Sequence, residues 1–121
     1  MLINGKNVGF LKTVKVNFDI KAMCPNKDTN KLPELFDPQL IDVADVYENS
    51  MKFIMALNHG YEDNLHYYNN EYKQNYITEE DMMYLDDEQF AALLMEAQEA
   101  YIGKSQEMKT EPKKNNEEVI Q

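Results

Sequence analysis

The sequence has 121 residues, enough for one hydrophobic core but too few for two independent ones. Hydrophobic residues make up 43% of the chain, while the formal net charge is -10 and the mean hydropathy is -0.67, so we expect one acidic domain with a modest core. All twelve basic residues are lysine. Because arginine is the side chain that best contacts phosphates and guanine edges, this composition disfavours nucleic-acid binding.

Cysteine usage and hydropathy indicate a cytoplasmic protein. Cys24 is the only cysteine, so no disulfide can form within the chain. The first residues do not show the charged and apolar regions of a signal peptide, and the longest apolar run, residues 53–57, is far too short for a membrane span. We therefore predict a protein that does not bind membranes.

The N-terminal segment predicts a short hairpin followed by an ambiguous element. Asn4 and Gly5 supply the positive φ angles of a tight turn, with apolar residues on both sides. Over residues 14–23 the apolar positions fit both a strand and a helical stripe. Thr13 as a cap and Pro25 as a stop favour the helix, and residues 26–31 then form a polar loop.

The clearest predicted element is a long helix that starts at Asp37 and Pro38, where Asp37 can cap it and Pro38 fits the first helical position. Gly60 then offers a left-handed stop, which gives about 22 residues, or roughly 33 Å. Further apolar residues lie off the main stripe, so we expect the helix to be central to the fold, or else partly covered by a partner. The stripe itself is Leu40, Val43, Ala44, Tyr47, Met51, Ile54 and Asn58.

The second half of the sequence predicts two shorter helices. Residues 61–77 are rich in Asn and Tyr without a clean period, which predicts a structured loop or a frayed helix. Thr78 and Asp86 each begin a capping-box pattern, so we expect one short helix after Thr78 and a longer one that ends at Gly103.

Together these elements predict a mainly α fold of the α+β class. A short N-terminal β-hairpin packs on a bundle of about three to four helices. Residues 1–103 form the single globular domain, and the mixed-charge residues 104–121 form a flexible, disordered C-terminal tail.

Few side chains have catalytic or metal-binding potential. His59 and His66 are separated by Glu62 and Asp63, which can gather a metal, but a helix-end position for His59 and a polar setting for His66 explain them better. Cys24 has no histidine near it in sequence, and the acidic pairs are better explained as helix starts. We therefore predict a protein that is not an enzyme, with no catalytic residues, no metal site and no cofactor.

The eight methionines indicate an adaptable contact surface as well as core packing. Met82 and Met83 are adjacent on a predicted helix, so they cannot both face one core. We predict that five residues contribute to a protein-binding surface, namely Met51, Phe53, Met55, Met82 and Met83.

Four short phrases follow one another in the sequence: INGKNVGF at residues 3–10, MCP at 23–25, IMALNHGY at 54–61 and LDDEQ at 85–89. Their order resembles that of tail assembly chaperones of phages and prophages of Gram-positive hosts, over residues 3–102. The resemblance implies a non-enzymatic protein of the host-cell cytoplasm, which binds and solubilises the tape-measure protein and leaves it as tail-tube subunits polymerise. The Tyr- and Asn-rich residues and the lack of arginine depart from that pattern and leave the partner surface undefined.

The charge distribution suggests two further interactions. Residues 61–102 carry eleven acids against Lys73 alone, which is suited to an acidic nucleic-acid mimic that inhibits a host defence nuclease, although a solvated helical surface is the commoner explanation. The start of the chain is slightly basic, so head-to-tail self-association is a second option. The salt dependence of binding distinguishes mimicry from chaperone activity. The affinity of a nucleic-acid mimic for its basic partner falls steeply as salt rises, whereas the affinity of apolar chaperone contacts does not.

Overall fold

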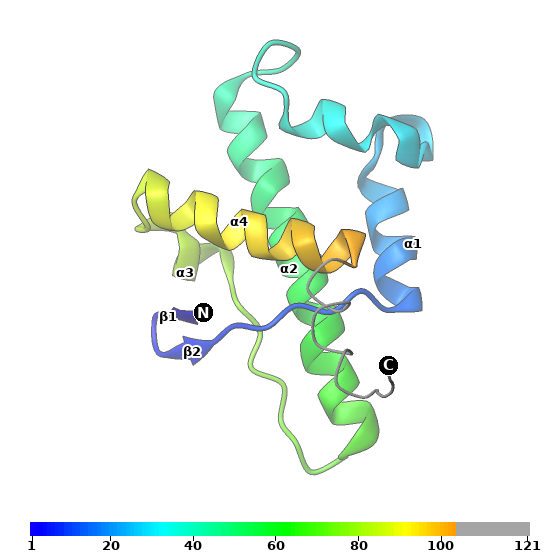
Figure 1. Cartoon of the computed structure of the whole chain (residues 1–121), viewed down its shortest axis with the longest axis vertical. Helices are drawn as coiled ribbons and strands as arrows, with labels where there is room; N and C mark the ends of the chain where they lie inside the picture. The colour runs from blue at the N-terminus through cyan, green and yellow to red at the C-terminus, as the bar shows by residue number, and fades with distance from the viewer. Residues whose placement is uncertain (104–121) are drawn as a thin grey trace, which may run out of the picture.

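A computed structural model describes residues 1–103 of the chain. Residues 104–121, for which the sequence predicts a disordered tail, lie outside the described residues. The described part contains a two-stranded hairpin, four α-helices and two 3-10 helices, and the longest helix runs through the middle of the molecule (Figure 1). The predicted mainly α fold with an N-terminal hairpin is confirmed.

The hairpin pairs strand β1 (Leu2–Ile3) with strand β2 (Lys6–Asn7) in antiparallel register, so that Leu2 lies opposite Asn7. The turn residues Asn4 and Gly5 have φ angles of 48° and 78°, as the predicted two-residue turn requires. Two residues per strand cannot form a stable ribbon alone. The hairpin is held because the Ile3 side chain is buried in the core.

The ambiguous segment is helix α1 (Val14–Met23). The Thr13 side-chain oxygen accepts a hydrogen bond from the Val16 amide at 3.3 Å, as its predicted capping role requires. Val16 and Ile20, one turn apart, are fully buried, whereas strand alternation would have placed Val14 and Phe18 on the same face as them. One helical stripe therefore packs on the core.

Two 3-10 helices, η1 (Pro25–Lys27) and η2 (Thr29–Phe36), stand where a loop was predicted over residues 26–31. The Asp28 carboxylate accepts from the Asn30 amide at 3.0 Å and caps the start of η2. The prediction missed them because 3-10 turns are short and have no long apolar period.

Helix α2 (Val43–Tyr68) has 26 residues and begins later than predicted. Asp37 does cap a turn, because its carboxylate accepts from the Gln39 amide at 2.9 Å, but that turn is not continued. Asp42 has an extended backbone and precedes the first residue of α2. The predicted start at Asp37 and Pro38 is therefore wrong by about one turn and a half.

The predicted end of this helix at Gly60 is also wrong. A left-handed stop needs a positive φ, which Gly60 does not have, and α2 continues for eight more residues to Tyr68. Glycine is required at position 60 because the N-terminal chain and helix α1 lie very close to α2 there. A Cβ at this position would collide with the Leu11 carbonyl oxygen and the Val16 side chain. The N-terminal chain crosses α2 so closely that the Leu11 amide donates to the Leu57 carbonyl at 3.1 Å. Residues 61–68 are therefore helix, residues 69–72 form a turn, and residues 73–78 have no regular secondary structure.

Helix α3 (Glu79–Met83) and helix α4 (Asp87–Ile102) begin with the predicted capping boxes, at Thr78 and Asp86. In each box the cap side chain accepts from a backbone amide three residues later, and that later residue's side chain accepts from the cap amide. Gly103 has a φ of 85° and ends α4, as predicted.

The core forms around α2, which contacts α1, η2 and α4 and therefore has the predicted central position. Figure 1 shows α4 crossing α2, with α1 on one side of the molecule and the starts of α3 and α4 on the other. Within residues 1–103, no helix combines the length and the apolar character needed to cross a bilayer. The apolar side chains that are almost fully buried are Val16, Ile20, Phe53, Ile54, Leu57, Ile77, Leu93 and Ala97.

Candidate functional site

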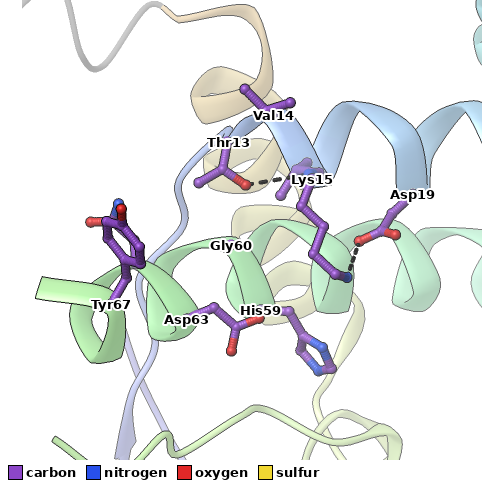
Figure 2. A pocket seen from close by; sticks show the side chains of 10 residues that line it. Thr13, Val14, Lys15, Asp19, His59, Gly60, Asp63 and Tyr67 are labelled. Carbon is purple, nitrogen blue, oxygen red and sulfur yellow. Dashed lines mark hydrogen bonds and ion pairs between the residues drawn. The ribbon is translucent and has the colours of Figure 1, made fainter. Parts of the chain in front are cut away.

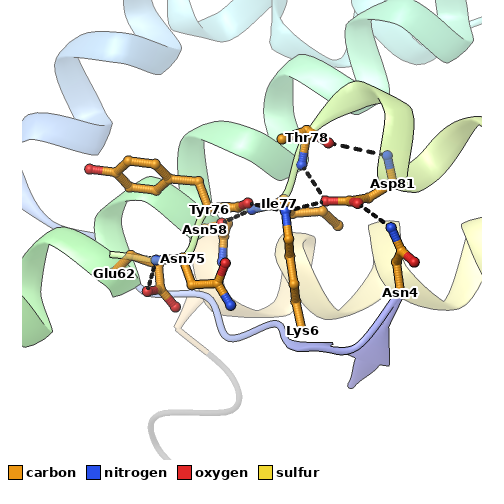
Figure 3. Close-up of polar contacts among 9 residues, drawn as sticks. All are labelled: Asn4, Lys6, Asn58, Glu62, Asn75, Tyr76, Ile77, Thr78 and Asp81. Atoms are coloured by element: carbon orange, nitrogen blue, oxygen red, sulfur yellow. Dashed lines mark hydrogen bonds and ion pairs between the residues drawn. The ribbon is translucent and has the colours of Figure 1, made fainter. Parts of the chain in front are cut away.

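Asn58 links both segment 69–78 and the N-terminal chain to α2, and Figure 3 shows its contact with Ile77 of that segment. Its fully buried side chain donates to the Gly9 carbonyl at 3.0 Å and accepts from the Ile77 amide at 2.8 Å. One side chain thus satisfies backbone groups of two segments that have no strand partner. The polar residue at the end of the predicted apolar stripe is therefore a structural link.

Glu62 holds the same segment one turn later. Its side chain is 2% exposed, and one carboxylate oxygen accepts from the Tyr72 hydroxyl at 2.7 Å and from the Asn75 amide at 2.8 Å. The hydrogen bond to Glu62 raises the pKa of Tyr72 to about 12, since the charged carboxylate disfavours a phenolate beside it. The neighbouring acid Asp63 accepts from Tyr76 and raises the pKa of that phenol to about 12 in the same way.

Asp81 joins the hairpin to the start of α3 (Figure 3). Its carboxylate accepts from Lys6 Nζ and from Asn4 Nδ2, each at 2.7 Å, and from the Thr78 amide at 2.9 Å. Burial alone would raise the pKa of Asp81, but these hydrogen bonds outweigh burial and hold that pKa well below its ordinary value. Asp81 therefore combines a capping role with an internal ion pair.

The four side chains that could have gathered a metal are engaged in other contacts. Glu62 and Asp63 bind the tyrosines of segment 69–78. His66 donates from Nδ1 to the Tyr72 carbonyl at 2.7 Å, because a carbonyl oxygen can only accept. The His59 ring stacks on Tyr76, 4.0 Å between centroids. Within residues 1–103, no three His, Cys, Asp or Glu side chains are arranged to hold a metal ion.

A pocket of about 560 Å³ lies between the start of α1 and the C-terminal part of α2 (Figure 2). His59, Asp63, Lys15 and Asp19 all line it. Both carboxylates already have partners in the chain, since Asp19 accepts from Lys15 Nζ at 3.0 Å and Asp63 accepts from Tyr76. Lys15 and Asp19 therefore bind each other, whereas Asp63 and His59 contact Tyr76, which lies outside the pocket lining.

Cys24 is buried at the end of α1, and its thiol donates to the Ile20 carbonyl at 3.2 Å. Burial raises its pKa, and the nearby charge of Asp28 raises it further. Both effects favour the neutral thiol, which is the less nucleophilic form. The structure thus gives Cys24 the environment of a packing residue.

An open apolar cleft of about 410 Å³ lies between η2 and the end of α4, and we name it the aromatic cleft. Its floor contains Phe53, which contacts Phe36 and Tyr101 edge to face, with ring centroids 5.5 and 5.6 Å apart. Lys12 Nζ lies 4.3 Å from the centroid of the Tyr101 ring and covers part of it. No carboxylate or lysine lines the cleft among the described residues. The lining residues are Leu32, Pro33, Phe36, Phe53, Gln98, Tyr101 and Ile102.

A second apolar hollow, about 320 Å³, lies between the first turns of α2 and α4, and we name it the acidic groove. Tyr47 forms its centre, with its ring 5.4 Å from Phe90 and its hydroxyl donating to Asp87 at 2.9 Å. This hydrogen bond raises the pKa of Tyr47. No lysine occurs in residues 38–51 or 74–103, from which the groove is built. The lining residues are Pro38, Val43, Val46, Tyr47, Ser50, Asp87, Phe90, Ala91 and Leu94.

The structure brings three of the five residues predicted to bind a partner together, because Met51, Met82 and Met83 line one hollow of about 340 Å³. Met51, Phe53 and Met82 are at most 9% exposed, and Phe53 lies at the floor of the aromatic cleft. Met55 is partly buried against the core, and only Met83, at 59% exposed, is freely accessible. One member of the Met82–Met83 pair is thus outside the core, as the helical argument required. The buried members of the set make internal contacts, and the partner-binding role of the five residues stays a prediction.

The residues that do line the two surfaces were missed as partner-binding candidates for two reasons. Ile102 is an apolar residue next to the predicted helix end at Gly103 and is 66% exposed, which is a signal that the sequence offered. Val43 and Tyr47 lie on the predicted interior stripe, yet they are 59% and 40% exposed because the stripe extends beyond the core. The exposure of Val43 and Tyr47 depends on tertiary packing, which no local sequence pattern indicates.

No family model matches this chain, and neither the curated proteins nor the solved structures contain one that is significantly similar to it.

Proposed function

We propose that this protein is a non-enzymatic phage tail assembly chaperone that binds the tape-measure protein and keeps it dispersed during tail morphogenesis. The family part of the proposal rests on the order of sequence phrases over residues 3–102. The observation that supports a binding role is the aromatic cleft, an uncharged hollow with three aromatic rings in its lining and an exposed apolar rim.

The aromatic cleft is suited to capture an apolar side chain that projects from a partner helix. Phe36 and Tyr101 form its walls, and Ile102, 66% exposed, extends the apolar surface at its rim. Full burial of one Leu or Phe side chain contributes about 1.5–3 kcal/mol. Contacts of this size are individually weak, which suits a chaperone that must leave when tube subunits arrive, and many copies along one partner give a stable coat.

The charge of the protein supports the same role. With a formal net charge of -10, each bound copy adds negative charge to the complex. Like-charged complexes repel one another and stay dispersed. No carboxylate lines the cleft among the described residues, so partner capture and dispersal are performed by different parts of the surface.

Co-expression with the tape-measure protein tests this proposal. The fraction of that protein left in the supernatant should be high with the wild-type chain and should fall with the variant Ile102→Glu, which places a carboxylate at the rim of the cleft. Leu2→Glu is the matched control, because Leu2 is similarly exposed at 72% but lies outside the cleft. If the tape-measure protein is equally soluble without this chain, the chaperone role is excluded.

Salt dependence provides a second measurement on the same complex. Contacts in an uncharged apolar cleft should persist from about 10 mM to about 1 M salt, although the Debye length falls from about 30 Å to about 3 Å. Steep weakening with salt, together with unchanged binding by Ile102→Glu, would instead favour a basic partner of the acidic surface.

A further inference from the structure

Helix α1 presents an apolar outer face with no partner among the described residues. Val14 and Phe18, one turn apart, are 75% and 68% exposed, although the opposite face of α1 is fully buried. Lys15 and Lys21 are both exposed and lie on either side of the stripe that these two residues form. Lys15 binds Asp19 at 3.0 Å, so the excess positive charge of this part of α1 comes from Lys21. We name this set, Val14, Lys15, Phe18 and Lys21, the α1 face.

The acidic groove has the complementary character. Val43 and Tyr47 form an exposed apolar stripe with the same one-turn spacing as Val14 and Phe18. Asp87 lines the groove, and the exposed acids Asp42 and Glu88 are sequence neighbours of lining residues. The α1 face therefore combines apolar residues with lysines, and the groove combines apolar residues with carboxylates.

We propose that the α1 face of one copy docks in the acidic groove of a second copy, so that this protein assembles head to tail. Charge complementarity selects the orientation, because two α1 faces or two grooves would bring like charges together. The equal spacing of the two stripes lets the side chains of one helix pack between those of the other.

The positions of the two faces decide what kind of assembly forms. Figure 1 shows α1 at one side of the molecule and the starts of α3 and α4 at the opposite side. Docking leaves each end of the assembly with one free face, so the contact is heterologous and continues into a chain or a ring. The aromatic cleft shares no residue with either face, so self-assembly does not depend on the proposed chaperone function.

Sedimentation velocity on the full chain tests the proposal. The wild-type protein should show larger species as its concentration rises in about 10 mM salt, and the association constant should fall on the order of tenfold or more in about 1 M salt. Phe18→Glu and Val43→Glu should each remain monomeric, since each places a carboxylate in one face. Both positions are exposed, and circular dichroism checks that both variants are folded.

An equimolar mixture of the two variants gives the decisive result. Phe18→Glu keeps an intact groove and Val43→Glu keeps an intact α1 face, so the mixture should form a dimer and nothing larger. Tyr68→Glu adds the same charge at a position that is 78% exposed and outside both faces, and it should associate like wild type. A mixture that stays monomeric, or a wild-type protein that is monomeric at every concentration in low salt, overturns the proposal.

Discussion

The two parts of helix α2 are held in place by different interactions. From Val43 to Leu57 the buried residues of α2 are mostly apolar, and they pack on α4 and η2. From Asn58 to Tyr68 the buried residues are Asn58, Gly60 and Glu62, and the two polar side chains hydrogen-bond to other segments. One continuous helix thus has an apolar first part and a polar second part.

This difference explains where the candidate binding surfaces lie. In the second part, each buried polar group binds a specific chain segment, so its contacts are completed inside the molecule. In the first part, apolar surface extends beyond the core and leaves Val43 and Tyr47 exposed. Phe53 of the same part floors the aromatic cleft. The apolar part of α2 therefore carries the surplus surface available to partners, and the polar part fixes the fold.

We expect the largest effect on stability from Asn58→Ala, which removes the polar link from the second part of α2. The change leaves the buried Ile77 amide and the Gly9 carbonyl without their hydrogen bonds. We expect a loss of about 3 kcal/mol in the free energy of unfolding, since each unsatisfied buried group costs about 1–3 kcal/mol. Urea denaturation measures the loss. The rate of amide hydrogen exchange should increase most at Ile77, because its amide loses its hydrogen-bond acceptor.

Asn64→Ala is the control for this variant, because Asn64 is on the same part of α2 but only partly buried. Its substitution should change the free energy of unfolding by about 0.5 kcal/mol or less. Equal losses for the two variants would show that Asn58 is not a special link, and that the polar part of α2 is held by packing.

Gly60→Ala tests the close crossing of the N-terminal chain over α2. Alanine favours a helix over glycine by about 1 kcal/mol, so an unobstructed site would be stabilised. Here the added methyl meets the Leu11 carbonyl and the Val16 side chain, and forcing apart such a contact costs about 1–3 kcal/mol. We expect a net loss of about 2 kcal/mol or less, measured by thermal denaturation. A rise in the melting temperature would contradict the close crossing.

The sequence predicted the parts of the fold that have local signals. Asn4 and Gly5 mark the hairpin turn, and Thr78 and Asp86 mark the helix starts, because each of these roles is performed within four residues. Gly60 was misread for the opposite reason. The same glycine is compatible with a helix stop and with close chain crossing, and only the distant Leu11 distinguishes the two.

The candidate surfaces were less predictable than the fold. A helical stripe shows which residues share a face, but it does not show where the neighbouring helix ends. Met51 and Val43 belong to the same predicted stripe, yet Met51 is 9% exposed and Val43 is 59% exposed. How the neighbouring segments pack on α2 decides which residues of the stripe are covered, and that packing depends on the whole chain.

Alkaline pH should weaken the polar part of α2 through the ionisation of Tyr72. The pKa of Tyr72 is raised from 10.0 to about 12 in the folded state by its hydrogen bond to Glu62. A raised folded-state pKa means that this contribution is complete below about pH 10 and is lost as the pH rises towards 12. Tyr72→Phe should therefore cost about 1 kcal/mol at pH 7 and flatten the decline in stability above pH 10. Urea denaturation at pH 7 and above pH 10 measures the free energy of unfolding of both proteins. Tyr67→Phe is the control, because Tyr67 is 79% exposed. If wild type and Tyr72→Phe decline in parallel, the Glu62 contact does not hold segment 69–78, and the contrast between the two parts of α2 loses its main support.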